Sequence, residues 1–180
     1  MATKLSSKHK DALEAYSKGL EYLSGCPDCD WDIKKARKCF GLAIKKDPNF
    51  VEAYEKLADI ALQSKSGQKD AEPDLAIKLL NKSIEINPHR ANAYFTLSDL
   101  YWSELSRSDL AIKNLDSVLR IDSNHPKALR LRGFVKYSIQ DFEGAKKDID
   151  KAAKLKPKDM TFLPYEKMKK YLEKRFGFVD

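Results

Sequence analysis

Three stretches of the chain repeat the same short pattern, and this internal repetition constrains the fold more than any other feature. The stretches begin at Asp47, Asn87 and Asp122, and each continues through a short turn-like segment to an alanine followed by Tyr or Leu. A second pattern, Asp-Leu-Ala-Ile-Lys, occupies residues 74–78 and recurs at 109–113. Self-similarity of this kind indicates a repeat protein, in which each unit buries its apolar side only against its neighbours.

The spacing between the repeated positions is regular. An interval of 12 residues separates Ala36 from Pro48, and the same interval recurs in the three later copies. An interval of 10 residues leads from Pro48 to Ala58 and recurs in the next two copies. Only the distance from the small residue to the following alanine varies, at 17, 18, 13 and 12 residues. The extra residues fall at 24–30 and 64–70, whose turn-forming composition predicts lengthened loops between the two helices of a repeat.

These residues resemble the tetratricopeptide repeat, whose pattern is an aromatic residue, Leu and a small residue, Tyr, Ala-x3-Phe and Pro. Tyr54-x2-Leu57-Ala58 and Tyr94-x2-Leu97-Ser98-x2-Tyr101 match the first half, and Ala36-x3-Phe40 matches the second half. The resemblance implies an all-α fold, a right-handed superhelical solenoid of helix-turn-helix repeats plus a C-terminal capping helix. We expect one solenoid domain over 1–180, with repeats at 12–50, 51–90, 91–125 and 126–159 and the capping helix at about 161–176.

Small residues in the pattern predict close contacts between paired helices. Gly19, Ala58, Ser98 and Gly133 would let the first helix of each pair approach the second. The C-terminal segment carries apolar residues at helical spacing that would cover the last repeat; they are Leu163, Met168, Tyr171, Leu172 and Phe176. Helix boundaries are expected at Asp30 and Pro73 for two second helices, at Asp159 or Thr161 for the capping helix, and at Gly177 for its end.

The resemblance also implies a concave groove, lined by the first helix of each repeat, that binds a partner peptide or helix. Read by helical period, its outward residues are Glu52, Glu55, Asp59, Asn92, Phe95, Asp99, Trp102, Lys127, Arg130, Phe134 and Tyr137. Such a groove is acidic at one end, aromatic in the middle and basic at the other. Aromatic stripes at helical spacing are usually core, so the alternative is that the four aromatic residues pack on the C-terminal helix or on neighbouring repeats.

One subset of the family binds the acidic C-terminal tails of chaperones with a two-carboxylate clamp of Lys, Asn, Asn, Lys and Arg. At the corresponding positions this chain has Glu55, Asp59, Thr96, Lys127 and Leu131, so only Lys127 matches. A carboxylate facing Glu55 and Asp59 would be repelled. Binding of chaperone tails is therefore disfavoured.

The formal net charge of +7 is concentrated near the C-terminus, because residues 126–180 hold 15 basic and 8 acidic residues whereas 1–125 hold 19 of each. This imbalance motivates a second hypothesis, the binding of nucleic acid or an anionic surface. The alternative is a solvated face and polar cap that keep the array soluble. The chain carries no recognised nucleic-acid-binding motif.

Cys26 and Cys29 form a C-x-x-C motif, which motivates a third hypothesis, an adaptor regulated by zinc or redox chemistry. A zinc site needs four ligands, but Cys39 adds only one thiolate and the three His are scattered. A thioredoxin-type site needs a strand-helix context that is missing here. We therefore expect loop cysteines, no bound metal and no cofactor.

The sequence predicts a protein that is not an enzyme. It contains no phosphate-binding loop, no G-x-G-x-x-G and no nucleophile signature around its His residues. It also lacks an apolar run near 18 residues and the apolar core of a signal peptide, so we expect a cytoplasmic location. The prediction is a non-catalytic scaffold or adaptor that binds a protein or peptide.

Overall fold

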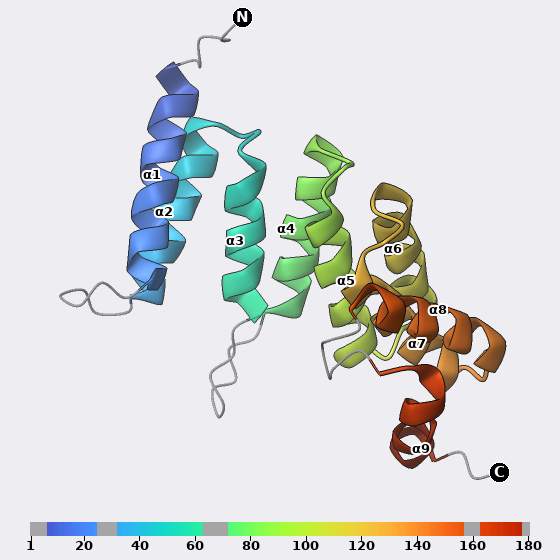
Figure 1. The fold of residues 1–180 in the computed structure, drawn as a ribbon. Helices are drawn as coiled ribbons and strands as arrows, with labels where there is room; N and C mark the ends of the chain where they lie inside the picture. The colour runs from blue at the N-terminus through green and yellow to red at the C-terminus, as the bar shows by residue number, and fades with distance from the viewer. Residues whose placement is uncertain (1–6, 25–31, 63–71, 157–162, 178–180) are drawn as a thin grey trace, which may run out of the picture. The chain divides into compact units, whose positions relative to one another are not determined.

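The computed structural model describes residues 7–24, 32–62, 72–156 and 163–177 (Figure 1). Within these ranges the chain forms α-helices and no strand, which confirms the all-α prediction. The helices are α1 (Ser7–Ser24), α2 (Ile33–Lys46), α3 (Val51–Leu62), α4 (Pro73–Ile86), α5 (Ala91–Ser103), α6 (Ser108–Ile121), α7 (Pro126–Ser138), α8 (Phe142–Leu155) and α9 (Tyr165–Phe176). None of these described helices has both the length and the apolar character needed to cross a membrane.

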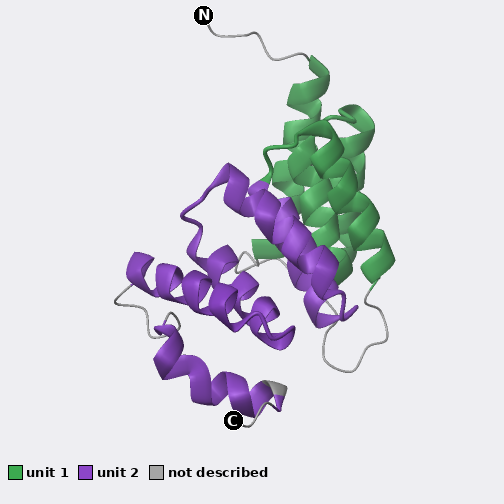
Figure 2. Ribbon diagram, turned by 90° about the vertical axis from the view of Figure 1, so that its right-hand side faces the viewer, with its two compact units in different colours: residues 1–90 green, residues 91–180 purple. Residues whose placement is uncertain are grey.

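The chain divides into two compact units, which are coloured separately in Figure 2. In unit 1, residues 1–90, α1 packs against α2, α3 packs against α4, and α2 contacts α3. In unit 2, residues 91–180, α5 packs against α6, α7 packs against α8, and α6 contacts α7, while α9 contacts both α7 and α8. The helix pairs are α1–α2, α3–α4, α5–α6 and α7–α8, and the two longer connections within a pair lie between α1 and α2 and between α3 and α4.

The junctions after α2, α4 and α6 share one local structure, which explains the recurring Asp or Asn. Asp47, Asn87 and Asp122 each leave the helical conformation for an extended one. The side-chain oxygen of each then accepts a hydrogen bond from the backbone N–H two residues later, at 3.0 Å in all three cases. Such Asx turns reverse the chain in few residues. Lys156 occupies this position after α8 and has no acceptor oxygen, and a longer connection, residues 156–164, precedes α9.

Close contact within the helix pairs is confirmed at the two glycines of the pattern. A Cβ atom on Gly19 would lie 2.6 Å from Cε1 of Phe40, and one on Gly133 would lie 2.6 Å from Cγ1 of Ile149. Both distances are far shorter than a normal carbon–carbon contact, so a side chain at either position would force its buried neighbour to shift. Ser98 occupies the same position in the third repeat and is fully buried.

Helix boundaries agree with the sequence in part. Pro73 begins α4 as expected, and Gly177 ends α9 with a left-handed φ of 74°. Asp30 lies outside the described residues, and the side chain that caps α2 is Asp32, which accepts a hydrogen bond from the Lys35 N–H at 2.9 Å. Helix α9 begins at Tyr165, later than expected, and its other proposed caps, at 159 and 161, are likewise not described.

The buried side of α9 also differs from the predicted stripe. Leu172 is fully buried and Met168 packs on the same cluster, as expected. Tyr171 is wrongly placed in the stripe, because it is 51% exposed, and Tyr165 is the buried aromatic residue instead. Helix α9 therefore covers the last repeat with a narrow apolar contact.

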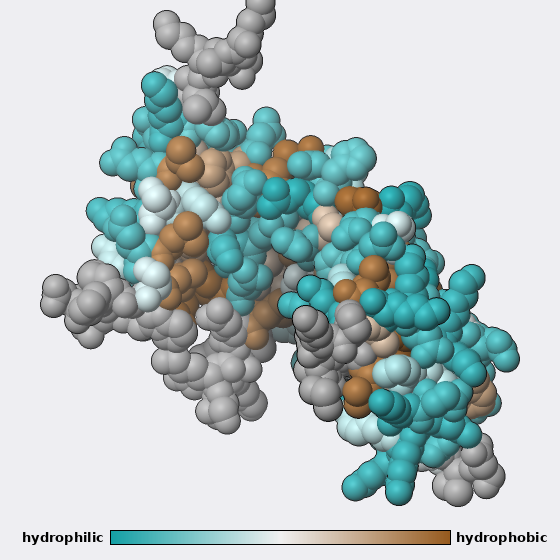
Figure 3. All heavy atoms as spheres, viewed as in Figure 1, coloured by the Kyte–Doolittle hydropathy of each residue, from teal (hydrophilic) through white to brown (hydrophobic). Residues whose placement is uncertain are grey.

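Side chains on the face drawn in Figure 3 are mostly hydrophilic, with hydrophobic residues in separate patches.

Candidate partner-binding surface

Three of the four acidic residues predicted for the groove, Glu52, Glu55 and Asp59, lie on α3 in unit 1, and each has a basic partner within that unit. Arg90 donates hydrogen bonds from Nη2 and Nε to the two carboxylate oxygens of Glu55, at 2.7 and 2.8 Å. Its Nη1 also reaches Glu52 at 3.0 Å. Glu55 accepts a further hydrogen bond from the Ser83 hydroxyl at 3.0 Å, and Asp59 pairs with Lys56 at 3.2 Å.

This arrangement changes the electrostatics expected for the acidic end. Only 26% of the Arg90 side chain and 15% of the Glu55 side chain are exposed, so the pair is largely shielded from solvent screening. The hydrogen bond to Glu55 raises the pKa of Arg90 above its usual range, which keeps the guanidinium charged at every relevant pH. The acidic end predicted for the groove therefore has most of its charge balanced within unit 1, by Arg90 and Lys56.

Arg90 was not identified as a site residue from the sequence, although its position in the repeat pattern indicated a contact. It is the fourth residue of the junction that begins at Asn87, where the equivalent residues of the other junctions are Phe50 and His125. Phe50 packs on Tyr16 of α1 at a ring separation of 5.1 Å, and His125 packs on Phe95 of α5 at 5.6 Å.

The three junction residues thus play the same part, each contacting the first helix of the preceding repeat. In two junctions the contact is between rings, and at Arg90 it is an ion pair. A charged residue at a position otherwise occupied by rings therefore signalled a partner of opposite charge on α3.

In unit 2, the predicted groove residues of α5 are partly available to a partner. Asn92 and Asp99 are exposed. Phe95 and Trp102 are half-buried, because they pack against the apolar cluster formed by α6 and α7. Although Asp99 is exposed, the surrounding residues remove part of the water around its carboxyl and so raise its pKa, and the nearby negative charge of Glu104 adds to the effect. The aromatic residues of α5 therefore combine core packing with a remaining exposed edge.

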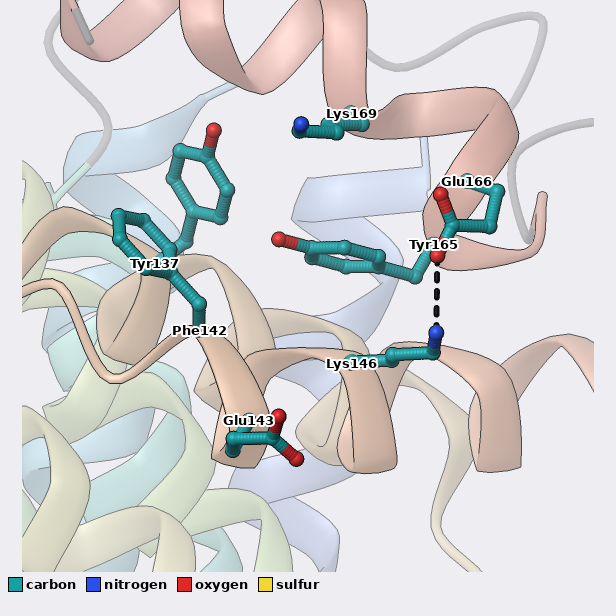
Figure 4. A pocket seen from close by; sticks show the side chains of 7 residues that line it. All are labelled: Tyr137, Phe142, Glu143, Lys146, Tyr165, Glu166 and Lys169. Carbon is teal, nitrogen blue, oxygen red and sulfur yellow. Dashed lines mark hydrogen bonds and ion pairs between the residues drawn. The ribbon is translucent and has the colours of Figure 1, made fainter. Parts of the chain in front are cut away.

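The predicted residues of α7 divide in the same way. Lys127 is exposed, and the guanidinium of Arg130 lies over the ring of Phe134 at 5.8 Å from its centroid. Tyr137 is only 2% exposed and packs against Tyr165 of α9. Tyr137 therefore does not line an open groove, and that part of the prediction is wrong. The alternative applies to this residue, because the C-terminal helix covers it (Figure 4).

Part of the basic charge near the C-terminus is also compensated internally. Arg132 binds Asp148 of α8 through two hydrogen bonds of 2.7 Å and Asp116 of α6 through one of 2.6 Å. Lys136 contacts the same Asp148 at 2.9 Å, and the side chain of Asp148 is only 5% exposed. These hydrogen bonds raise the pKa of Arg132. The network fixes α6, α7 and α8 relative to one another and leaves Arg132 unavailable to an anionic ligand.

The cysteine motif can be followed only in part. Cys26 and Cys29 lie outside the described residues. Cys39 is a half-buried free thiol on α2. Among the residues that the structure describes, no group of three or more His, Cys, Asp or Glu could hold a metal ion.

Comparison with known proteins supports the repeat assignment. A family model of the tetratricopeptide repeat matches residues 91–125, which span α5 and α6. Comparison with curated protein sequences gives no significant match. The fold is similar to that of MamA protein, with a TM-score of 0.70 and 20% sequence identity over 93% of this chain and 89% of that chain.

Two further solved structures share this fold. YrrB, a TPR protein with an unusual peptide-binding site, is similar with a TM-score of 0.66 and 22% identity over 87% of this chain and 74% of that chain. The first TPR of Spaghetti (RPAP3), bound to the HSP90 peptide SRMEEVD, has a TM-score of 0.59 and 17% identity over 73% of this chain and 97% of that chain.

The repeated helix pairs, the sequence match in the third repeat and the shared fold agree with one another. Residues 91–125 match the tetratricopeptide repeat, as the residue pattern predicted, and the chain shares the fold of solved tetratricopeptide-repeat proteins. Proteins of this class present the surfaces of stacked helices to partners and typically serve as scaffolds for protein–protein interaction.

Proposed function

We propose that this protein is a non-catalytic scaffold that binds a peptide or helix of a partner protein on the first helices of its repeats. The observation that carries the proposal lies in unit 2, where α5 and α7 are in contact. There the exposed Asn92, Asp99 and Lys127 accompany the half-buried Phe95 and Trp102. Aromatic side chains beside polar groups are the residue types that anchor protein interfaces.

The acidic residues predicted on α3 contribute little to ligand selection. Because Glu52 and Glu55 are already paired with Arg90, they offer little attraction to a basic ligand. Asp99 and Lys127 are exposed and of opposite charge. A segment with an apolar anchor for Phe95 and Trp102, and with charges of both signs beside it, is the best match.

Binding of a chaperone tail is not part of the proposal. The RPAP3 domain was solved with such a peptide, but its likeness to this chain extends to the fold alone. Of the five clamp positions only Lys127 matches here, and Glu55, which stands at a position that requires a cation, is tied to Arg90. An acidic C-terminal tail would therefore lack most of its charge-assisted hydrogen bonds.

Affinity capture with charge-reversal variants tests the proposal. Asp99→Lys and Lys127→Glu change exposed residues of α5 and α7, whereas Lys113→Glu and Lys147→Glu change exposed residues of α6 and α8. A partner identified by capture and then purified should lose affinity for the first pair and keep it for the second. Equal losses in all four variants, or losses confined to the second pair, would reject the proposed surface.

A further inference from the structure

His125 connects the two helices of the surface proposed above. It immediately precedes α7, and its Nδ1 accepts a hydrogen bond from the backbone N–H of Ala128 in the first turn, at 3.1 Å. Its half-buried ring also packs on Phe95 of α5, with the ring centroids 5.6 Å apart and the planes tilted by 34°. One imidazole therefore caps α7 and holds the beginning of that helix beside an aromatic residue of the binding surface.

The acceptor at this cap differs from the acceptors at the side-chain caps of α2 and α8. Asp32 accepts a hydrogen bond from the Lys35 N–H before α2, and Asp141 accepts one from the Gly144 N–H before α8, both at 2.9 Å. Aspartate ordinarily stays ionised at neutral and mildly acidic pH. The hydrogen bond from the Lys35 N–H also lowers the pKa of Asp32. An imidazole nitrogen, by contrast, accepts only while it carries no proton, so mild acidification removes the α7 cap and leaves the other two.

The hydrogen bond to Ala128 requires one protonation state of the ring. Because Nδ1 accepts, the neutral ring carries its proton on Nε2. In the imidazolium form Nδ1 also carries a proton, which would point at the Ala128 N–H, and the positive end of the α7 dipole disfavours a cation there. The ring must then turn away, which also changes its contact with Phe95. The cap and the ring contact therefore exist together only with the neutral imidazole.

The charged residues of the junction and of the helices around it have other contacts or face solvent. Asp122 is engaged in its own Asx turn, and Lys151 of α8 binds a backbone oxygen of the junction at 2.7 Å. Arg120 of α6 and Lys127 of α7 are exposed, and α5 contributes an aromatic ring to the contact. Within the described residues, no hydrogen bond or ion pair joins the His125 side chain to a charged group. Protonation of the ring itself therefore decides whether the cap exists.

We propose that His125 is a positioning residue that makes the surface of α5 and α7 dependent on pH. The neutral imidazole holds the first turn of α7, and with it Lys127, beside Phe95. Protonation releases that turn, so a partner bound on this surface loses affinity as the pH falls. The effect on binding rests on the function proposed above, whereas the loss of the cap is a property of the free protein.

Nuclear magnetic resonance of the free protein tests the cap directly. Long-range proton–nitrogen correlation spectra of the imidazole at about pH 8 should place its proton on Nε2. As the pH falls to about 5.5, the Ala128 amide resonance should shift together with the ring signals of His125. The amide of Gly144, whose cap is a carboxylate, should stay in place. A proton on Nδ1 in the neutral ring, or equal shifts of the two amides, would overturn the proposal.

His125→Asn keeps a cap but removes its titration, because the asparagine side-chain oxygen is a good acceptor that takes up no proton. The cap stabilises the folded protein only while the ring is neutral, so its contribution is present at high pH and is lost as the pH falls. From about pH 8 to 5.5 the unfolding equilibrium constant of wild type should therefore rise roughly fivefold more than that of His125→Asn, which is the typical worth of a cap.

His89→Asn is the matched control for this comparison. His89 is exposed, and within the described residues its side chain makes no hydrogen bond, ion pair or ring contact. This variant should keep the pH dependence of wild type, because all other titrating groups are shared. Equal pH dependence in wild type and His125→Asn would refute the role of His125.

Binding of the purified partner separates failure of this proposal from failure of the proposed function. Wild type should bind roughly fivefold more weakly at about pH 5.5 than at about pH 8, and His125→Asn should lose much less. If Asp99→Lys loses binding but wild type and His125→Asn respond equally to pH, the role of His125 is rejected and the surface stands. If Asp99→Lys binds as wild type does, the proposed surface itself is rejected.

Discussion

Replacement of Gly133 by alanine is the sharpest test of how the helix pairs are held together. The added Cβ would lie 2.6 Å from Cγ1 of Ile149 and 3.2 Å from the backbone oxygen of Ala145. Carbon atoms prefer about 3.5–4.0 Å, so α7 and α8 must separate by roughly 1 Å or the buried Ile149 must leave its rotamer. The backbone oxygen cannot rotate away, so a change of the Ile149 rotamer alone does not relieve both contacts.

The free energy of unfolding should fall, by as much as about 2 kcal/mol. Overpacking of a tight core costs about 1–3 kcal/mol, whereas alanine improves on glycine inside a helix by roughly 1 kcal/mol. Gly41 provides the matched control, because it lies inside α2 and a Cβ there has no neighbour within 4 Å. Gly41→Ala should therefore raise stability by about 0.5–1 kcal/mol.

Urea unfolding followed by circular dichroism at the helical band measures both changes. In a double-mutant cycle with Ile149→Ala, the methyl group added at residue 133 should occupy part of the space that the smaller side chain vacates. We expect favourable coupling of at least about 1 kcal/mol. If Gly133→Ala stabilises the protein as Gly41→Ala does, or if the cycle gives no coupling, the close contact of α7 with Ile149 is refuted.

Three further predictions concern the remaining contacts. Arg90→Ala should lower the free energy of unfolding by about 1–3 kcal/mol in urea unfolding, because it leaves Glu55 shielded and unpaired, and Glu55→Gln in that background should recover part of the loss. Asp99→Asn should raise the thermal midpoint at neutral pH. Because folding raises the pKa of the Asp99 carboxyl, the free energy of unfolding falls as pH rises through the folded-state pKa, and the neutral amide avoids this loss. The gain should vanish below the ordinary pKa of about 3.8, where Asp99 is protonated in both states. Trp102→Ala should cost about 2 kcal/mol in the same melts, since the ring packs on the α6–α7 cluster, and an unchanged midpoint would mean that the ring is not part of that cluster.

The helical repeat could be predicted from the sequence because its signals are local and recur. Asp47, Asn87 and Asp122 form the same Asx turn, so a correct prediction of one turn also predicts the other two junctions. Gly19 and Gly133 stand where a side chain does not fit, and that requirement is visible as a small residue at a fixed interval.

The candidate surface was less predictable because its residues depend on partners that periodicity does not reveal. Helical period places Glu55 on the outward face of α3, but it does not disclose that Arg90 neutralises it from the next junction. Tyr137 has the spacing of a groove residue, but the position of α9 decides whether its side chain is exposed. The connection that precedes α9 lacks the repeated pattern, so the sequence did not indicate where α9 packs. Tyr165 was left out of the predicted apolar stripe although it precedes Met168 by three residues and packs in the same cluster as Met168 and Leu172.

Site-specific photo-crosslinking tests the central proposal, partner binding on α5 and α7, most directly. A photoreactive residue is placed at the exposed Asn92 or Lys127, and in control proteins at the exposed Lys113 or Lys147 of α6 and α8. With the purified partner, crosslinks should form from Asn92 and Lys127, and an excess of unmodified protein should suppress them. Crosslinks that form equally from all four positions, or only from Lys113 and Lys147, would contradict the proposed binding surface.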